Sequence, residues 1–344
     1  MAQHLSASQL TPWITRAALQ HGDALPQHLM QRLAISRRRA GTLLRQLVAI
    51  QCLASLGTPR KPRYAPGPLR QVVKRYALAG LQEDAPWRRD FDPCFTLPPA
   101  VRRMAQHAFT ELLNNAIDHS GGMNVTVSMR QTPLQLQLLV SDDGCGLFRR
   151  IEHSFAIDDP QMAMLELSKG KLTSAPDTHC GHGLFFTSRL ADVFDIHANE
   201  AAFQCRAWER RRWRQGKPAA RSGTSVYLAI SLDTPRTLDE VLRAHGMRPE
   251  GWAFDRTVVP LHLAGHGTHG ELALASRAEA RRVAARLADF RGAELDFEGI
   301  ADIGHGFADE LFRVFGSAHP RLVLTPVHMT PRVAAMVAAV RETA

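Results

Sequence analysis

The 344-residue sequence predicts a multidomain α+β protein, and three observations lead to this fold class. The N-terminal stretch combines helical patterns with a basic charge. The middle contains segments with a period of two, which is typical of half-buried antiparallel strands. The last stretch alternates short apolar strands with amphipathic helices, which indicates a small α/β layer. We therefore expect three domains, over residues 1–66, 67–235 and 255–344.

The composition is that of a soluble globular protein, with 45% hydrophobic and 22% charged residues. No apolar run approaches the ~20 residues that cross a bilayer. The first residues lack a basic region followed by a long apolar core, so we expect no signal peptide. The five cysteines are scattered and form no C-x-x-C pair, which argues against a disulfide framework or a zinc site. We expect a cytoplasmic protein without a membrane partner.

The positive charge is concentrated at one end of the chain. Residues 1–90 contain 14 Lys and Arg but only 4 Asp and Glu, a net charge of +10, whereas the whole chain carries +9. The remainder is therefore close to neutral. A basic segment on a neutral body is typical of a module that binds a polyanion, and a solvated basic surface is the alternative.

The N-terminal pattern predicts a helix over residues 25–34, a short turn, and a second helix over 37–54 with Ser36 as its N-cap. The apolar stripe of the second helix consists of Ala40, Leu43, Leu44, Leu47 and Val48. Its first turn holds three consecutive arginines. Cations at a helix N-terminus oppose the helix dipole, so a role other than helix stability is expected for them.

The stretch "LAISRRRAGTLLRQLVAIQCL" resembles the winged helix-turn-helix of small bacterial transcription regulators, and the resemblance covers about residues 8–66. It implies a recognition helix that enters the major groove by its N-terminal end. The stretch "GTPRKPRYAPG" would be a basic wing on phosphates. The DNA-binding candidates are Arg37, Arg38, Arg39, Arg60, Lys61 and Arg63. The alternative is a helical adaptor that packs on the next domain or on a second copy of the chain, as in a homodimer.

In the middle of the chain we expect helices near residues 69–82 and 98–119. Strands are expected over 123–130, 134–143, 194–210 and 223–231. Segment 144–182 interrupts these strands and is rich in Gly, Ser, Asp and His. A long irregular stretch of this kind is often a functional lid. The basic run 209–223 is expected to be a long hairpin loop.

The stretch "FTELLNNAIDHSGG" places Glu111, Asn115 and His119 at steps of four residues. Each step of four rotates a helix position by only about 40°, so the three polar side chains share one stripe. The other face is apolar and consists of Met104, Ala105, Ala108, Leu112, Leu113, Ala116 and Ile117. Because that face packs into a core, the polar stripe must face water, a partner or a ligand.

Three further motifs follow this helix in order. They are D-x-G-x-G, then G-x-G-L at the start of a helix, then G-T at the start of a strand, formed by Asp142, Gly144, Gly146, Gly181, His182, Gly183, Leu184 and Thr224. The ordered set resembles the GHKL ATPase superfamily, which includes gyrase-type ATPases, heat-shock chaperones, MutL-type repair proteins, histidine kinases and anti-sigma serine kinases. The resemblance covers about residues 100–230. It is closest to the kinase branches, and it implies a Bergerat-type α/β sandwich that holds ATP under a mobile lid.

The resemblance implies a role for each residue type. Asn115 would supply an oxygen ligand to Mg²⁺, and Glu111 would act as a general base. Asp142 would accept a hydrogen bond from the adenine amino group, and Thr224 would lie near the adenine. The glycines of D-x-G-x-G let the backbone approach the base. The G-x-G-L motif, with its residues His182 and Leu184, offers backbone N–H groups to phosphates.

Three residues have competing interpretations. His119 matches a position where this branch often has His or Lys, but it would also serve as a helix C-terminal cap. Lys169 and Lys171 are candidate phosphate contacts, or they are solvated residues of the lid. A sensor histidine kinase is not expected, because residues 67–100 contain no phosphoacceptor His on a helical hairpin.

The tail is expected to form strands over 257–264, 293–299 and 321–326 and helices over 276–290, 303–317 and 329–342. It resembles the STAS-like domain of unknown function found in bacterial ATP-binding proteins, and more distantly the anti-sigma antagonists. In those antagonists a serine at a helix start accepts phosphate. Here "DIGHGFADEL" has no Ser or Thr, and His305 lies at that place. His305 is either a phosphoacceptor or a turn histidine, and Asp309 and Glu310 complement the helix dipole.

These features predict a cytosolic bacterial regulator that couples Mg-ATP binding, with slow hydrolysis where it occurs, to DNA binding and to signalling through a STAS-like domain and its protein partner. A serine or histidine protein kinase of the anti-sigma-factor kinase type is the first alternative. A partner-switching module that does not bind DNA is the second. The sequence leaves open whether ATP is hydrolysed, transferred or only bound.

Overall fold

The computed structural model describes residues 6–58, 61–172, 181–209, 213–219, 222–248, 251–252, 254–265 and 274–342. The chain divides into two compact units. Unit 1 consists of Met1–Cys145 and Ser222–Pro235, and unit 2 of Gly146–Arg221 and Arg236–Ala344. The division therefore falls inside the segment 67–235 that the sequence suggests as one domain. In the described part of the chain, no helix is both long enough and apolar enough to cross a membrane.

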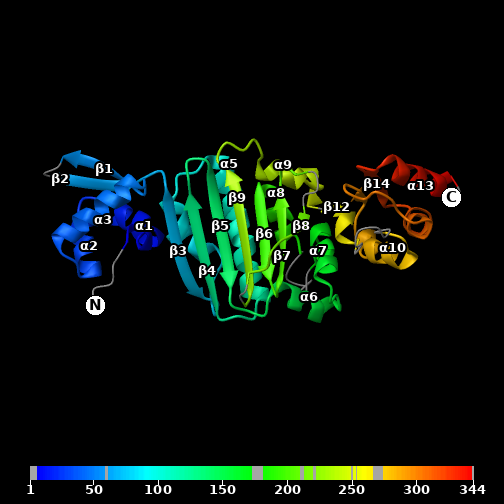
Figure 1. Ribbon diagram of the computed structural model, residues 1–344, viewed down its shortest axis with the longest axis horizontal. Helices are drawn as coiled ribbons and strands as arrows, with labels where there is room; N and C mark the ends of the chain where they lie inside the picture. Colours follow the sequence, from blue (N-terminus) through cyan, green and yellow to red (C-terminus); the bar gives the residue numbers. More distant parts are fainter. Residues whose placement is uncertain are drawn as a thin grey trace. The chain divides into compact units, whose positions relative to one another are not determined.

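Unit 1 begins with three helices and a hairpin, drawn in blue in Figure 1. After a 3-10 turn (η1, Ala7–Gln9), the elements are α1 (Thr11–His21), α2 (Leu25–Leu33), α3 (Arg37–Ala49), β1 (Leu53–Thr58) and β2 (Lys61–Pro66). The two strands are antiparallel, and Leu53 pairs with Pro66. Apolar side chains from all three helices, among them Ile14, Leu29 and Leu43, form one buried core.

The predicted N-cap of α3 is confirmed, because Ser36 Oγ accepts a hydrogen bond from the backbone N of Arg39 at 3.3 Å. The helix ends earlier than predicted, at Ala49 instead of residue 54. Gln51 adopts a left-handed conformation with φ 61°, which no α-helix can continue through. Leu53 is buried and already belongs to the hairpin.

The predicted helix over residues 69–82 is wrong, since this segment contains strand β3 (Arg70–Ala77). β3 pairs antiparallel with β4, and buried Val72 lies opposite Met129. Val72, Val73 and Tyr76 are residue types that favour a pleated, half-buried surface. Pairing with a strand more than 40 residues away thus overrides the apparent helical pattern.

The remaining strands of unit 1 and its long helix confirm the sequence prediction. Helix α5 (Pro99–His119) lies on one face of β3, β4 (Asn124–Gln131), β5 (Gln135–Asp142) and β9 (Thr224–Ser231), which are consecutive neighbours (Figure 1). Met129, Leu138 and Leu228 lie opposite one another in register and are fully buried. They form the centre of the core between the sheet and the helix.

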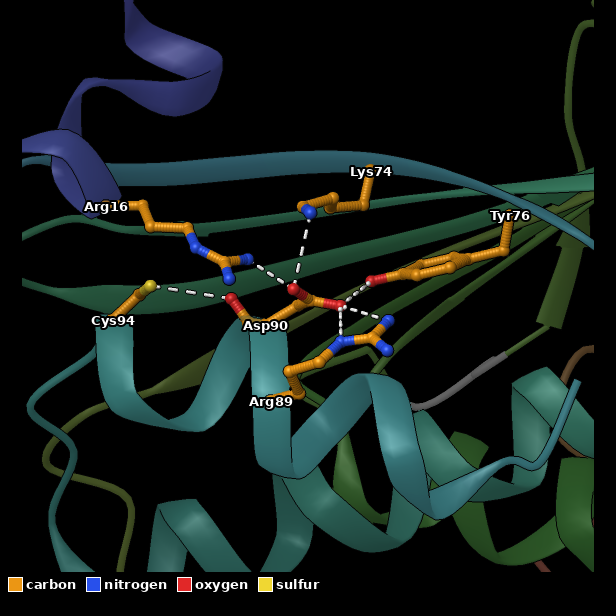
Figure 2. A network of polar contacts seen from close by, with 6 residues as sticks. All are labelled: Arg16, Lys74, Tyr76, Arg89, Asp90 and Cys94. Carbon is orange, nitrogen blue, oxygen red and sulfur yellow. Dashed lines mark hydrogen bonds and ion pairs between the residues drawn. The ribbon is translucent and has the colours of Figure 1, made fainter. Parts of the chain in front are cut away.

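A buried carboxylate connects the N-terminal helices to this sheet (Figure 2). Asp90 lies in a π-helical turn (η2, Trp87–Phe91), and its side chain is only 1% exposed. It accepts hydrogen bonds from Arg16 of α1, from Tyr76 Oη at 2.9 Å, and from Arg89 Nε at 3.0 Å. The ammonium group of Lys74 on β3 lies 3.3 Å away. Three cations and one phenol from three separate segments therefore converge on a single charge.

The first part of unit 2 differs from the sequence prediction in two places. Segment 144–182 is not wholly irregular, because it contains α6 (Leu147–Phe155) and α7 (Pro160–Lys169). The segment predicted as one strand over 194–210 is a hairpin of β6 (Val193–Ala198) and β7 (Ala201–Arg206). Its two turn residues, Asn199 and Glu200, both have positive φ, which matches the twist of a tight hairpin. Helix α8 (Gly183–Leu190) precedes this hairpin.

The segment 209–223, predicted as a hairpin loop, contains a short strand, β8 (Trp213–Gln215), which pairs with β7. Residues 210–212 and 220–221 of this segment lie outside the described residues.

The second part of unit 2 confirms the predicted alternation of strands and helices. Strands β12 (Arg256–Pro260), β13 (Gly292–Asp296) and β14 (Val323–Val327) form a parallel sheet in that order. The other α-helices and strands are α9 (Leu238–Ala244), β10 (Met247–Arg248), β11 (Gly251–Trp252), α10 (Arg277–Ala284), α11 (His305–Ala308), α12 (Gly316–Ala318) and α13 (Pro331–Glu342), and a π-helical turn, η6 (Asp309–Phe315), joins α11 to α12. Strand β14 is not buried as predicted, because it is an edge strand among the described strands and Val323 is 63% exposed.

Candidate functional site

In unit 1, the loop after α5 is bonded to the loop after β5. Ser120 Oγ donates to the carbonyl of Ala116 and accepts from the N–H of Gly122, while the Ser120 carbonyl accepts from Cys145 N at 2.9 Å. A Cβ at Gly144 would lie 2.1 Å from the carbonyl oxygen of Ser120. Only glycine therefore allows the two loops to approach so closely.

The side chain of Asp143, in the loop after β5, bonds the start of β4. Its Oδ1 accepts from the backbone N–H groups of Met123 and Asn124, both at 2.8 Å, and its Oδ2 accepts from Asn124 Nδ2 at 2.9 Å. These bonds, led by the backbone N–H of Asn124, lower the pKa of the Asp143 carboxyl. The sequence motifs do not single out Asp143, and its only signal in the sequence is its position next to Asp142 at the end of a strand.

Asp142 is the last residue of β5 and is buried. Its Oδ1 accepts from the backbone N of Gly144 at 2.9 Å and from the backbone N of Thr224 at 3.1 Å. Gly223 has φ 78°, and a Cβ there would lie 2.1 Å from the Asp142 carbonyl oxygen. Burial raises the pKa of Asp142, although the two backbone N–H groups act against this. The structure thus brings Asp142, Gly144 and Thr224 together with Gly223, the glycine of the G-T motif.

The polar stripe of α5 has the predicted character. Glu111, Asn115 and His119 are partly exposed, whereas Leu112 and Leu113 on the other face are buried. The Asn115 Nδ2 atom is buried and has no hydrogen-bond partner among the described residues. An unpaired buried N–H group costs about 1–3 kcal/mol, so this amide is suited to an acceptor that a ligand or water supplies.

In unit 2, the G-x-G-L residues lie at the start of α8 and are partly exposed. Gly181 has φ 66°, and a Cβ there would lie 2.7 Å from the carbonyl oxygen of Leu172. The His182 ring packs on Phe254 with centroids 4.8 Å apart. Burial, and then the charge of Lys171, lower the pKa of His182 to about 4. His182 is therefore neutral at pH 7 and offers no positive charge to an anion.

Gly146 of the D-x-G-x-G motif begins α6 with φ 90°. A Cβ there would lie 2.3 Å from the side-chain oxygen of Asn199, so glycine is required for this contact as well.

Lys169 is fully buried, with its ammonium group on the carboxylate of Glu166 and 3.0 Å from the carbonyl oxygen of Ala285. The phosphate contact suggested for Lys169 is therefore replaced by a buried ion pair, and the solvated interpretation does not apply either. Lys171 donates to the Asp289 carbonyl at 2.6 Å and lies over the Phe290 ring.

Residues 61–206 match the family model of the histidine kinase-like ATPase domain. The chain contains an ATPase domain of this kind. Residues 279–334 match the model of a STAS-like domain of unknown function, so a small STAS-like domain follows. No curated protein matches the chain. The ATPase-domain match begins within the N-terminal hairpin and includes α5, Asp142 and the G-x-G-L motif, but no family model matches the helices α1 to α3.

The DNA-binding candidates precede the ATPase domain or lie at its first residues. Arg37 and Arg38 are exposed in the first turn of α3, and Arg39 is partly buried. Lys61 is exposed on β2, and Arg63 forms an exposed ion pair with Asp23. Arg60 lies outside the described residues.

In the STAS-like domain, His305 is exposed at the start of the short helix α11. Asp309 and Glu310 are buried, and they do more than complement a helix dipole. Asp309 accepts from Arg313 and Arg277, and the bond from Arg313 lowers its pKa. Glu310 accepts from Arg281 of α10 at 2.7 Å. These ion pairs attach the segment after α11 to α10. In the described part of the chain, no group of three or more His, Cys, Asp or Glu is placed to hold a metal ion.

Proposed function

We propose that the histidine kinase-like ATPase domain binds Mg-ATP, and that the chain is a regulatory protein whose STAS-like domain transmits the signal to a protein partner. The observation that supports this most is the setting of Asp142. It is a buried carboxylate held by two backbone N–H groups, inside a domain that matches an ATPase family.

In this proposal unit 1 recognises the base. Asp142 Oδ1 is engaged by Gly144 and Thr224, so Oδ2 would accept the hydrogen bond from the adenine amino group. Gly144 lacks a Cβ and lets the backbone approach the ring, and Thr224 lies beside the carboxylate.

The polar stripe of α5 would hold the metal and the reacting water. The Asn115 oxygen would be a ligand of Mg²⁺, and its unpartnered Nδ2 would donate to a phosphate oxygen. Magnesium would neutralise phosphate charge when bound. Glu111 would accept a proton from a water or a substrate hydroxyl, and His119 would approach the phosphates from the end of the helix.

The G-x-G-L motif would bind phosphates through its backbone. Gly181 and Gly183 would offer their backbone N–H groups at the start of α8, where the helix dipole favours an anion. His182 and Leu184 would serve as the spacers of the motif, and Gly146 would shape the adenine loop. Lys169 is not among the proposed ligands, because its ammonium group is buried in an ion pair with Glu166.

Titration calorimetry with ATP, with and without Mg²⁺, tests this proposal. We expect magnesium-dependent binding that Asp142→Asn weakens about 100-fold, because an amide can keep the backbone bonds but presents a donor to the adenine amino group. Asp143→Asn is the matched control and should change the ATP affinity less than about threefold. The Asp143 carboxylate bonds the backbone N–H groups of Met123 and Asn124 and has no proposed contact with adenine. Equal binding by wild type and Asp142→Asn, or no binding at all, would refute the proposal.

We further propose that the three N-terminal helices and the hairpin of β1 and β2 form a winged helix that binds DNA. The exposed Arg37 and Arg38 at the N-terminus of α3, with Lys61 on the wing, support this second activity. The helix dipole disfavours cations at the N-terminus of a helix, so helix stability does not explain these arginines.

Fluorescence anisotropy with a labelled DNA duplex over a range of salt concentrations checks the DNA-binding proposal. Arg37→Ala and Arg38→Ala should each weaken binding and reduce the slope of log K against log[salt] by about 1. Arg282→Ala, an exposed arginine of the STAS-like domain, is the control and should leave the slope unchanged. If the wild type shows no affinity for DNA at low salt, the N-terminal helices are an adaptor for protein instead.

A further inference from the structure

The end of α7 is anchored by a buried ion pair. The side chains of Lys169 and Glu166 are 0% and 4% exposed, and they form an ion pair one turn apart on the helix. The Lys169 ammonium group also donates to the carbonyl of Ala285, at the end of α10. The Lys169 backbone carbonyl accepts from Thr257 Oγ1 on β12 at 2.7 Å. The side chain and the backbone of Lys169 are therefore both bonded to the C-terminal part of unit 2.

Arg286 completes the anchor from the STAS-like domain. Its Nη1 lies 3.1 Å from Glu166 Oε2, and its Nη2 donates to the carbonyl of Gly170 at 3.1 Å. One guanidinium group thus holds the last turn of α7 and the residue after it. Arg286 adopts a left-handed backbone with φ 61°, a conformation that non-glycine residues rarely keep unless surrounding contacts maintain it.

The same anchor reaches the G-x-G-L motif through an aromatic side chain. Gly170 has φ 78° and lies so close to Phe254 that a Cβ would be 2.5 Å from its ring. The other side of the contact is α8, because the rings of His182 and Phe185 lie 4.8 and 4.7 Å from Phe254. Phe254 is therefore packed between the end of α7 and the first turn of α8.

We propose that Arg286 is a positioning residue of the ATP site, through which the STAS-like domain sets the place of the G-x-G-L motif. This inference rests on the proposed ATP binding. Arg286 fixes Glu166 and Gly170, Gly170 fixes Phe254, and Phe254 supports the start of α8. The Arg286 side chain is 26% exposed, but the Glu166 carboxylate that it bonds is buried, and this hydrogen-bonded pair restricts the geometry of the contact more than apolar side chains would. A partner that displaces Arg286 would thereby weaken the hold on the phosphates.

Calorimetry with two ligands, ATP and adenosine, tests this inference on the full chain. Arg286→Gly removes the guanidinium group but suits the left-handed backbone, so it should unfold no more easily than Arg286→Ala. Both variants should bind ATP about tenfold more weakly and adenosine as tightly as the wild type, because the proposed hydrogen bond to adenine comes from Asp142, which Arg286 does not contact. Arg286→Lys keeps one charge near Glu166 and should restore part of the ATP affinity. Arg282→Ala, exposed on α10, is the matched control.

The outcomes separate this inference from the proposed function. Wild-type ATP affinity in Arg286→Gly would overturn the positioning role and leave ATP binding intact. Equal weakening for ATP and adenosine would show a general structural effect and would also overturn it. If the wild type binds neither ligand, the proposed function itself fails and the positioning role fails with it.

Discussion

Replacing Asp90 by alanine is expected to lower the free energy of unfolding by about 3 kcal/mol. The carboxylate is only 1% exposed, and Arg16, Lys74, Tyr76 and Arg89 all point to it (Figure 2). Removal leaves three cations close together without their counter-charge. Because Arg16 belongs to α1 and Lys74 to β3, we also expect the attachment of the N-terminal helices to the sheet to weaken.

The effect of Asp90 should depend on pH in a defined direction. Burial alone would raise its pKa, but the hydrogen bonds from Arg89, Arg16, Tyr76 and Lys74 outweigh this and hold the pKa well below its usual range. A carboxyl with a depressed pKa contributes stability that is fully present above its unfolded pKa of about 3.9 and is lost as the pH falls further. The difference in the free energy of unfolding between the wild type and Asp90→Asn should therefore shrink below about pH 4.

Urea unfolding at pH 7 and at pH 3 checks both statements. Asp84→Ala is the matched control. Asp84 lies only six residues before Asp90 in the chain, and it forms an exposed ion pair with Arg88. Exposed pairs of this kind contribute about 0–1 kcal/mol. A loss at Asp90 no larger than that at Asp84 would contradict the interpretation of Asp90 as the central charge of this network.

Gly223→Ala is expected to lower ATP affinity at least about 100-fold and to destabilise unit 1 by about 3 kcal/mol. Its φ of 78° disfavours any side chain, and the new Cβ would lie 2.1 Å from the Asp142 carbonyl oxygen and 2.8 Å from Asp142 Oδ1. Backbone must move to relieve that contact. Since the neighbouring Thr224 N–H bonds Asp142, the movement would displace the carboxylate proposed to bind adenine.

Gly121→Ala separates backbone strain from this clash. Gly121 also has a left-handed backbone, with φ 63°, but among the described residues nothing lies within 4 Å of the position that an alanine methyl group would take there. We expect a loss of about 1 kcal/mol and an unchanged ATP affinity. Calorimetry and urea unfolding of both variants provide the comparison. Wild-type ATP affinity in Gly223→Ala would show that Asp142 is not held as described or does not bind the base.

Features that depend on near neighbours were accessible from the sequence. The step of four residues from Glu111 to Asn115 predicted a polar stripe on α5, and Ser36 was recognised as an N-cap. Both follow from the geometry of a single helix. The order of the glycine motifs indicated an ATPase domain, which the family model supports. The G-T motif also marked the start of the strand β9, where the N–H group of Thr224 bonds the Asp142 carboxylate.

Features that depend on distant partners were decided by the tertiary structure alone. The segment 70–77 is a strand because β4 pairs with it, and nothing within the segment specifies that partner. Lys169 lies in the interior because the Glu166 carboxylate and the Ala285 carbonyl oxygen bond its ammonium group, although its local sequence suggested a lid residue. Asp90 became the centre of a network only when α1 and β3 brought their cations to it. Local spacing and capping act within a few residues and can be read along the chain, whereas burial and charge pairing arise only when segments far apart in sequence meet in space.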